Sequence, residues 1–481
     1  MTALLASLVA GVRREGDVVV ADVNPAAPDE HVATVRLAGP ALAAEAVDAA
    51  ARAFAHWRDT PPPARGDVLR RAAGLLEERA EEIGRDLARE EGKTLAEATG
   101  ETRRAAAILR YFGGQTLEPD GETYPSQSPV TFLYARREPL GVVTAITPWN
   151  FPIAIPAWKL GPALAFGNTV VWKPAEIVPL TATHLATALA DAGLPDGVLN
   201  LVLGRGSVVG DVLVTHPRVD AVTFTGSNAV GRALQLKATE AGAKVQLELG
   251  GKNPAVVLAD ADLELAAEQI ARGAFLSTGQ KCTATSRVIV EQPVLPELSE
   301  RLAELARTWK VGDPLDASTT IGPLASASQL ETVSGYLALA GREAARVLAG
   351  GGRPDGPGYF VEPTVLADLP ATSRVVREEI FGPVATLLPA GSYGEAVVLA
   401  NDTPFGLTAA LFTHSLDKAL RFARDVRAGV VKINQESAGL ELQAPFGGMR
   451  DSSSGSREQG KVARDFFTQW KTVYLDTPDG G

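Results

Sequence analysis

Hydrophobic residues recur at helical spacing in three segments near the start of the chain, at about 41–57, 65–91 and 101–113. The short apolar stretch 4–12 precedes them, and we interpret it as one turn of a buried helix. It lacks the preceding basic region and the small-residue cleavage site of a signal peptide. The first part of the chain is therefore predicted to be helical.

From residue 142 onward, short apolar runs alternate with amphipathic segments. Strands that alternate with helices of this length indicate βαβ units and a parallel sheet covered on both faces. A second series of the same kind is expected between about 254 and 434. In the first series we predict strands at 142–147, 169–172, 198–202 and 221–224, and helices at 155–166, 179–192, 207–215 and 229–241.

Two strand-like runs, 130–137 and 471–475, have no obvious partner inside such a domain. We expect them to pair with each other or across subunits. The chain has 481 residues, of which 46% are hydrophobic. It is too long to form one compact core, which suggests two or three domains.

The net charge of −11 and the absence of a lysine–arginine block exclude nucleic acid as an expected partner. No run reaches the roughly 18–20 apolar residues that a membrane span needs, so no membrane association is expected. Cys282 is the single cysteine, which rules out an internal disulfide and a multi-cysteine metal site. We expect no metal, and a cytoplasmic enzyme fits this composition best.

Cys282 lies after a helical segment in the sequence GQKCT, residues 279–283. A buried structural thiol is the alternative, but such a thiol does not need a neighbouring glycine and lysine. The cation of Lys281 would favour the thiolate, which is the reactive form. None of the five histidines lies in a motif-like setting, which disfavours a cysteine protease or thiol esterase.

A carboxylate is the remaining candidate for a base. Glu248 ends an apolar run and is followed by the pair Gly250 and Gly251. Burial would raise its pKa toward neutrality, which suits removal of a proton from water. The alternative is a glutamate at a strand end that forms a salt bridge.

Two glycine-containing segments follow predicted strands and open predicted helices. GRGSVVG at 204–210 approaches the dinucleotide fingerprint, although its last interval is one residue too long. FTGS at 224–227 is followed by Gly231, and free amides at such a helix start favour a pyrophosphate. KPAE at 173–176 places a lysine and a carboxylate at a strand end, where they can bind ribose hydroxyls.

Seven segments together resemble the aldehyde dehydrogenase family, in family order and over nearly the whole chain. They are PWNFP at 148–152, KPAE at 173–176, FTGS at 224–227, ELGG at 248–251, GQKC at 279–282, EIFGP at 379–383 and PFGG at 445–448.

The resemblance implies that Cys282 is the nucleophile, that Glu248 is the base, and that Asn150 and the Cys282 backbone N–H bind the oxyanion. The implied cofactor is NAD, with NADP as the alternative. Lys173 and Glu176 would hold the adenine ribose, and Glu379 the nicotinamide ribose. The implied cofactor contacts are Thr147, Pro148, Trp149, Lys173, Pro174, Glu176, Gly206, Gly210, Phe224, Thr225, Gly226, Ser227, Leu249, Gly250, Glu379 and Phe381.

The same resemblance implies an α/β architecture with three parts. A Rossmann-like cofactor domain would comprise 1–122 and 141–248, and an α/β catalytic domain 249–445. A small β-flap, 123–140 and 462–478, would join subunits into a homodimer or homotetramer.

The segments QKCTATSR at 280–287, REQG at 457–460 and FFT at 466–468 resemble the α-ketoglutaric semialdehyde (2,5-dioxopentanoate) dehydrogenase branch. Some relatives place an arginine for a substrate carboxylate where this chain has Trp158. Arg104 is then the candidate for binding an anionic aldehyde; the alternative is a surface arginine paired with Glu101. The candidate substrate contacts are Arg104, Phe151, Trp158, Lys281 and Thr283.

Two other functions remain open. A coenzyme A-acylating branch of the family generally lacks the base glutamate, so Glu248 argues against it. A catalytically silent nucleotide-binding protein with this fold would usually have lost a catalytic residue, whereas Cys282, Glu248 and Asn150 are all present.

Overall fold

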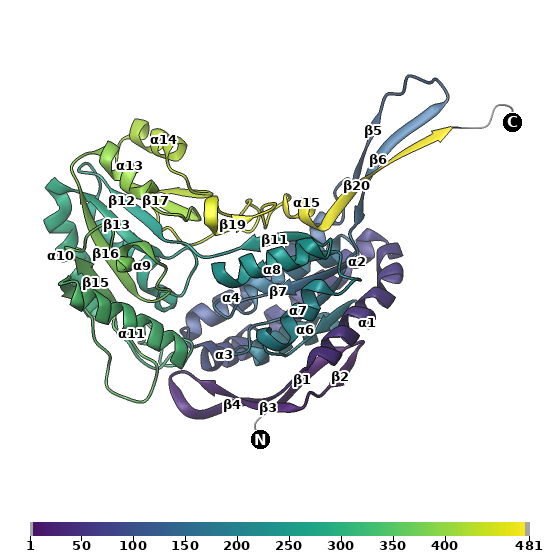
Figure 1. Ribbon diagram of the computed structural model, residues 1–481, viewed down its shortest axis with the longest axis horizontal. Helices are drawn as coiled ribbons and strands as arrows, with labels where there is room; N and C mark the ends of the chain where they lie inside the picture. The colour runs from purple at the N-terminus through teal and green to yellow at the C-terminus, as the bar shows by residue number, and fades with distance from the viewer. Residues whose placement is uncertain (1–2, 477–481) are drawn as a thin grey trace.

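The computed structural model describes residues 3–476, which form two large sheets and one small one (Figure 1). The larger sheet has ten strands, and its central strands β11, β10, β7, β8 and β9 run parallel to one another. Its strands are β1 (Ala3–Val9), β2 (Val12–Arg14), β3 (Val18–Asn24), β4 (Ala27–Leu37), β7 (Val142–Ile146), β8 (Thr169–Lys173), β9 (Leu199–Leu201), β10 (Ala221–Thr225), β11 (Lys244–Glu248) and β19 (Ser453–Ser454).

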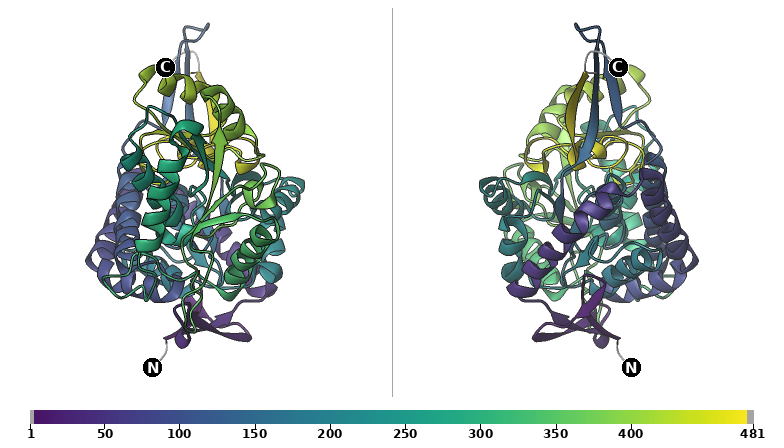
Figure 2. Two further views of the ribbon diagram at one scale, coloured as in Figure 1. Left: turned by 90° about the vertical axis from the view of Figure 1, so that its left-hand side faces the viewer. Right: turned by 90° about the vertical axis from the view of Figure 1, so that its right-hand side faces the viewer.

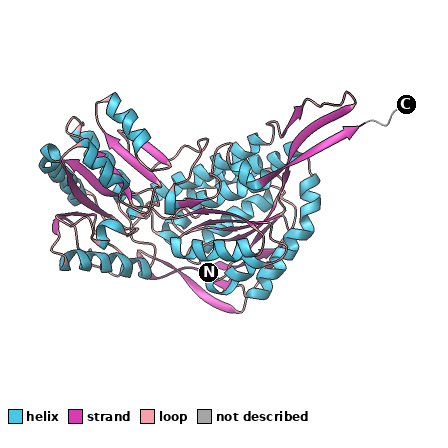
Figure 3. Ribbon diagram, turned by 45° about the horizontal axis from the view of Figure 1, so that its top comes forward, coloured by secondary structure: helices cyan, strands magenta, loops and turns pink. Residues whose placement is uncertain are grey.

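Helices cover both faces of this sheet (Figure 3). Strands β7 and β8 are buried at every position, as parallel strands between two helical layers must be. The predicted βαβ series is therefore confirmed. The helices are α1 (Pro40–Asp59), α2 (Pro62–Glu78), α3 (Ala80–Glu91), α4 (Leu95–Gln115), α5 (Ala154–Ala165), α6 (Pro179–Asp191), α7 (Gly206–Thr215) and α8 (Asn228–Glu240).

The second series forms a seven-stranded sheet with its own helices. Its strands are β12 (Asn253–Val257), β13 (Thr285–Glu291), β14 (Arg346–Ala349), β15 (Thr364–Ala367), β16 (Val384–Ala390), β17 (Thr408–Phe412) and β18 (Val430–Ile433). Its helices are α9 (Leu263–Phe275), the 3-10 turn η1 (Leu276–Gly279), α10 (Leu295–Thr308), α11 (Ala327–Arg342), α12 (Arg374–Arg377), α13 (Tyr393–Asn401) and α14 (Leu416–Asp425).

A three-stranded sheet projects from the body of the molecule (Figures 1 and 2). It consists of β5 (Gly121–Tyr124), β6 (Thr131–Pro139) and β20 (Thr468–Asp476), and the short helix α15 (Ala463–Phe467) leads into β20. Strands β6 and β20 pair antiparallel over their whole length. This confirms that the two unpartnered runs of the sequence pair with each other. The domain boundaries at 122, 140, 248 and 445 stay a prediction.

Residues 3–37 contain four strands, which contradicts the helix turn predicted at 4–12. Segment 4–12 is not a helix turn: it contains β1, whose burial alternates at every second residue from Leu5 to Val9, and the start of β2. Strand β1 pairs with β4 on one side and touches β9 on the other. A short apolar run is ambiguous between helix and strand, and here pairing with a strand distant in sequence decides it.

Segment 65–91 also differs from the prediction, because it forms two helices. They are separated at Arg79, whose φ of −103° and ψ of 14° interrupt the helical backbone. Among the described residues, no helix has the length and apolar character needed to cross a membrane.

Candidate active site

The carboxyl ends of the parallel strands bring several of the predicted residues to one edge of the larger sheet. Thr225, at the end of β10, is paired with Glu248, at the end of β11. Ile146, at the end of β7, is paired with Lys173, at the end of β8. Open parallel sheets bind ligands outside this edge, so the strand order itself assembles the candidate site.

Cys282 follows the 3-10 turn η1 and is half-buried. The Asn253 side-chain amide donates to the Cys282 carbonyl at 2.8 Å. Burial of the thiol, with the nearby carboxylates Glu379 and Glu248, raises the Cys282 pKa. The expectation that Lys281 makes the thiolate favourable is therefore wrong, because its ammonium donates instead to the Arg272 carbonyl at 3.0 Å.

Glu248 is 2% exposed and lies against β19. Its Oε2 accepts from the Ser453 hydroxyl at 2.6 Å, while Oε1 has no hydrogen-bond partner among residues 3–476. Burial, followed by the neighbouring carboxylate of Glu458, raises the pKa of Glu248 well above its ordinary value. The predicted direction is confirmed, and the group suits a general base.

Two further residues near Glu248 were not assigned a role from the sequence. Lys159, 1% exposed, forms an ion pair with Glu458 and donates to Thr223 Oγ1 at 2.8 Å. Lys159 stands in the otherwise apolar helix α5, and that isolated charge was the available signal. Lys159 and Glu458 thus place an ion pair near Glu248.

Asn150 is 3% exposed and lies beside the loop that leads to Cys282. Its side-chain Nδ2 donates to the Gln280 carbonyl at 2.9 Å. A primary amide has two N–H donors, so the second remains for an oxygen near Cys282. The structure thus brings together all three predicted catalytic residues.

The predicted ribose contacts Lys173 and Glu176 lie at and after the end of β8, next to the start of α7. The Gly206 backbone N–H donates to Glu176 Oε1 at 2.8 Å, which places a carboxylate at the positive end of the helix. Lys173 Nζ donates to the Pro174 carbonyl at 3.0 Å, and burial lowers the Lys173 pKa. Gly210 is buried one turn further along α7.

The start of α8 carries the predicted pyrophosphate contacts. Ser227 is the residue before the helix, and its hydroxyl makes no capping hydrogen bond to the described backbone. The Gly226 N–H donates to the Glu248 carbonyl at 3.1 Å. A Cβ at Gly226 would lie 2.6 Å from the Phe224 ring, and one at Gly231 2.5 Å from the Leu249 side chain, so a larger residue at either position would displace these side chains.

Glu379 lies at the junction of the two large sheets. Its Oε1 accepts from the Gly251 N–H at 2.9 Å, and a Cβ at Gly250 would lie 2.1 Å from its Oε2. Burial raises the pKa of Glu379 to about 7. The ring of Phe381 meets Trp149 edge to face with centroids 5.3 Å apart.

The remaining cofactor candidates lie at the carboxyl ends of β7 and β10. Thr147 Oγ1 accepts from the Trp172 indole N–H at 2.9 Å, and Pro148 follows it directly. Thr225 Oγ1 is buried with no hydrogen-bond partner in the described part of the chain. The exposed apolar residues Val208 on α7 and Val230 on α8, 43% and 50% exposed, were not singled out from the sequence.

Arg104 is half-buried on α4, and its guanidinium donates to the Leu440 carbonyl. The alternative pairing with Glu101 is wrong, because the carboxylate of Glu101 binds Lys93 at 2.6 Å. Arg103, the neighbouring arginine, has a side chain 57% exposed.

The other candidate substrate contacts form a mainly aromatic group. The Trp158 ring lies 6.1 Å from that of Phe446, and the buried Trp158 Nε1 has no hydrogen-bond partner within 3–476. The ring of Phe151 faces the Lys93 ammonium at 4.2 Å. Thr283 is buried, and its carbonyl accepts from the Ser437 hydroxyl at 2.8 Å.

Comparison with known proteins agrees with this geometry. A sequence model described as "Aldehyde dehydrogenase family" matches residues 12–473. The alpha-ketoglutaric semialdehyde dehydrogenase of Bacillus subtilis is 47% identical, over 96% of this chain and 95% of that protein. The 2,5-dioxopentanoate dehydrogenase of Saccharolobus solfataricus is 42% identical, over 94% and 95%. A crystal structure of betaine aldehyde dehydrogenase from Staphylococcus aureus in complex with NAD+ has a TM-score of 0.95 at 35% identity and covers 98% of this chain and 94% of that one.

Proposed function

Because this chain belongs to the aldehyde dehydrogenase family, we propose that it oxidises an anionic semialdehyde to the carboxylic acid with NAD. The observation that carries the proposal is the convergence of Cys282, Glu248 and Asn150 beside one strand edge. The similarity to an alpha-ketoglutaric semialdehyde dehydrogenase supports a substrate with a carboxylate.

The residues at the starts of α7 and α8 fit a dinucleotide. Glu176 accepts a backbone N–H at the α7 terminus and can also accept ribose hydroxyls. Val208 and Val230 offer apolar side chains from two helices in contact, which suits a planar base. Ser227 and the free amides of α8 suit a pyrophosphate. Glu379, beside the glycine pair 250–251, would take the second ribose.

In the first step, the Cys282 thiol loses its proton to solvent, the sulfur attacks the aldehyde carbon, and the carbonyl electron pair moves to oxygen. The free N–H of the Asn150 amide and the Cys282 backbone N–H then hold the oxyanion. Losing one donor of this kind typically costs on the order of 10²–10³ in rate. Bound NAD would supply the hydride acceptor, and loss of the hydride from this carbon would leave Cys282 as a thioester.

In the second step, Glu248 removes a proton from water. The water oxygen attacks the thioester carbon, the carbon–sulfur bond breaks, and the acid is released. A raised pKa suits this task, since the carboxylate form of a group with a higher pKa accepts a proton from water more readily.

Arg104 is the proposed partner of the substrate's anionic group. Its guanidinium uses one N–H on the Leu440 carbonyl, and the other donors of the planar group remain for a carboxylate. Phe151 and Trp158 would line the path between Arg104 and Cys282.

The proposed assembly is a homodimer or homotetramer joined through the sheet β5–β6–β20. That sheet exposes the large apolar side chains Phe132, Trp470, Tyr474 and Leu475. Light scattering of the native protein and of a Tyr474→Asp variant tests this: the variant is expected to have the smaller mass.

The only cysteine of the chain allows a direct test of the mechanism. One equivalent of an alkylating reagent should add a single mass label and abolish aldehyde oxidation, and Cys282→Ala should lose oxidation while still binding NAD. Product analysis with and without coenzyme A should give the free acid in both cases. An acyl-coenzyme A product, or turnover by Cys282→Ala, would contradict the proposal.

A further inference from the structure

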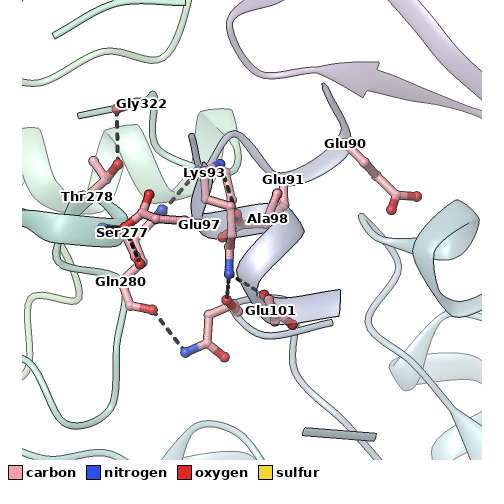
Figure 4. Close-up of polar contacts among 12 residues, drawn as sticks. Glu90, Glu91, Lys93, Glu97, Ala98, Glu101, Ser277, Thr278, Gln280 and Gly322 are labelled. Carbon is pink, nitrogen blue, oxygen red and sulfur yellow. Dashed lines mark hydrogen bonds and ion pairs between the residues drawn. The ribbon is translucent and has the colours of Figure 1, made fainter. Parts of the chain in front are cut away.

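The segment at the start of α4 connects the candidate oxyanion donor with the candidate substrate wall. Lys93, which precedes the helix, is 2% exposed. Its Nζ donates to Glu101 Oε2 at 2.6 Å and to the Asn150 backbone carbonyl at 2.7 Å (Figure 4). The same ammonium lies 4.2 Å from the centroid of the Phe151 ring. One buried cation therefore touches two consecutive site residues.

Glu101 holds the other end of the same segment. While one of its oxygens neutralises Lys93, the other accepts the backbone N–H groups of Ile153 and Ala154, each at 3.1 Å. A buried ion pair is tolerated when its remaining hydrogen-bonding capacity is satisfied. Because that condition is met here, the backbone from Asn150 to Ala154 is fixed to α4 at both ends.

Glu97, one turn earlier on α4, holds the loop that carries the nucleophile (Figure 4). Its Oε1 accepts from the Ser277 N–H at 2.8 Å and from the Ser277 hydroxyl at 2.9 Å. Ser277 and Thr278 both have a φ of 54°, a conformation that residues with a Cβ rarely adopt. The Thr278 hydroxyl donates to the Gly322 carbonyl at 3.0 Å. Side-chain hydrogen bonds thus retain an unfavourable turn just before Cys282.

The Asn150 side chain links the segment held by Lys93 and Glu101 to the loop held by Glu97, because its amide donates to the Gln280 carbonyl in that loop. We propose that Lys93 and Glu97 are positioning residues, which together hold the Asn150 amide and the Cys282 loop at the separation that the oxyanion requires. This proposal rests on the role of Asn150 in the proposed function. Neither residue is expected to touch the reacting atoms.

The test needs a variant that removes Lys93 without leaving a buried charge, so we choose the double variant Lys93→Met with Glu101→Gln. Glu91, whose carboxylate lies 3.9 Å from Lys93, has a pKa raised to about 8 by burial. Lys93→Met removes a cation that lowers the Glu91 pKa, and Glu101→Gln removes a carboxylate that raises it. Because the cation has the larger effect, the double change favours the neutral form of Glu91. Arg103→Gln, an exposed change on the same helix, is the matched control.

The measurement is the rate constant of the first turnover, followed by rapid mixing as reduced NAD appears, together with the dissociation constant for NAD. The double variant should slow the first turnover by roughly 10- to 100-fold, because a misplacement of about 1 Å can cost 10²-fold. The dissociation constant for NAD should be unchanged in the double variant, and Arg103→Gln should keep the native first-turnover rate. Lys93→Arg should keep more of the rate than the double variant.

Repeating the double change in an Asn150→Ala background separates positioning from stability. If Lys93 acts through Asn150, adding the double change to Asn150→Ala should alter the first-turnover rate by less than about twofold. The effects of substitutions at coupled residues are not additive. An equal loss in both backgrounds would overturn the proposal. An undiminished rate in Asn150→Ala alone would instead overturn the proposed oxyanion role, which is a different outcome.

Glu97→Ala provides a second route if the double variant does not fold. It removes the hydrogen bonds to Ser277 and those that Glu97 Oε2 accepts from the Thr94 N–H and hydroxyl at the start of α4, and it keeps both partners of the Lys93–Glu101 ion pair. We expect at least a roughly tenfold slower first turnover with unchanged NAD affinity. An unchanged first turnover in this variant would overturn the proposal.

Discussion

The start of α7, where the adenine end of the cofactor would bind, and the chemical side of the candidate site share the same strand edge but differ in burial. At the start of α7, Glu176, Gly206 and Val208 are exposed, and the Gly206 backbone N–H provides a polar contact. On the chemical side, Asn150 and Glu248 are 3% and 2% exposed, and the raised pKa values of Glu248 and Cys282 follow first from burial. An exposed surface can recognise a ligand through fixed dipoles, whereas changing the basicity of a side chain requires removing water.

The largest expected effect is on the chemical side. Glu248→Gln should still release one equivalent of reduced NAD and then stall as a thioester, since only water activation is lost. Steady-state turnover should fall on the order of 10²–10⁴-fold. Rapid mixing measures the first turnover, and steady-state assays measure the later ones. Ser453→Ala, which removes the hydroxyl that donates to Glu248, is a milder control variant and should have an intermediate effect. A first turnover slowed as much as the steady state would mean that Glu248 also activates the thiol.

The burial of the thiol predicts an unusual pH dependence. The Cys282 pKa is raised above the ordinary 9.0, so in the unliganded enzyme the thiolate fraction should keep increasing as pH passes 9. The alkylation rate, measured by mass spectrometry with iodoacetamide, should rise about tenfold per pH unit over this range. Glu248→Gln removes one of the charges responsible and should speed alkylation at a given pH. A plateau below pH 9 would show that the thiol is not desolvated.

The substrate end of the chemical side should show a smaller effect. Arg104→Ala should lower kcat/KM for a carboxylated aldehyde by roughly ten- to hundredfold, as a hydrogen bond to a charged group is worth about 1.5–3 kcal/mol. A neutral aldehyde of similar length should be affected little, and Arg103→Ala should change neither. Equal losses for both aldehydes would make Arg104 structural.

The smallest effect is expected on the cofactor side. Glu176 would repel the 2′-phosphate of NADP, so the enzyme should prefer NAD. Glu176→Gln should raise the NADP to NAD ratio of kcat/KM by no more than about fivefold, because interactions between exposed charges are well screened. Steady-state assays with both cofactors at two salt concentrations measure this. A native enzyme that uses both cofactors equally would show that the carboxylate moves aside.

Local patterns determined much of the molecule. Buried apolar runs separated by amphipathic helices were sufficient for the βαβ series, because both periodicities are local properties of the chain. Residues at the carboxyl ends of those strands, such as Lys173 and Glu248, could be assigned because parallel strands all end at the same edge. The segment containing Cys282 was identifiable from its composition and from its resemblance to a family.

Only the tertiary structure decided the contacts that join distant segments. Strand β1 becomes a strand through pairing with β4 and β9, which its own short apolar run could not indicate. The Lys159–Glu458 pair joins residues 299 positions apart, and Lys93 reaches Asn150 across 57. The direction of the Cys282 pKa shift likewise depends on which charges the fold brings near the thiol. Such contacts reflect packing of whole elements, and no local pattern in the chain encodes them.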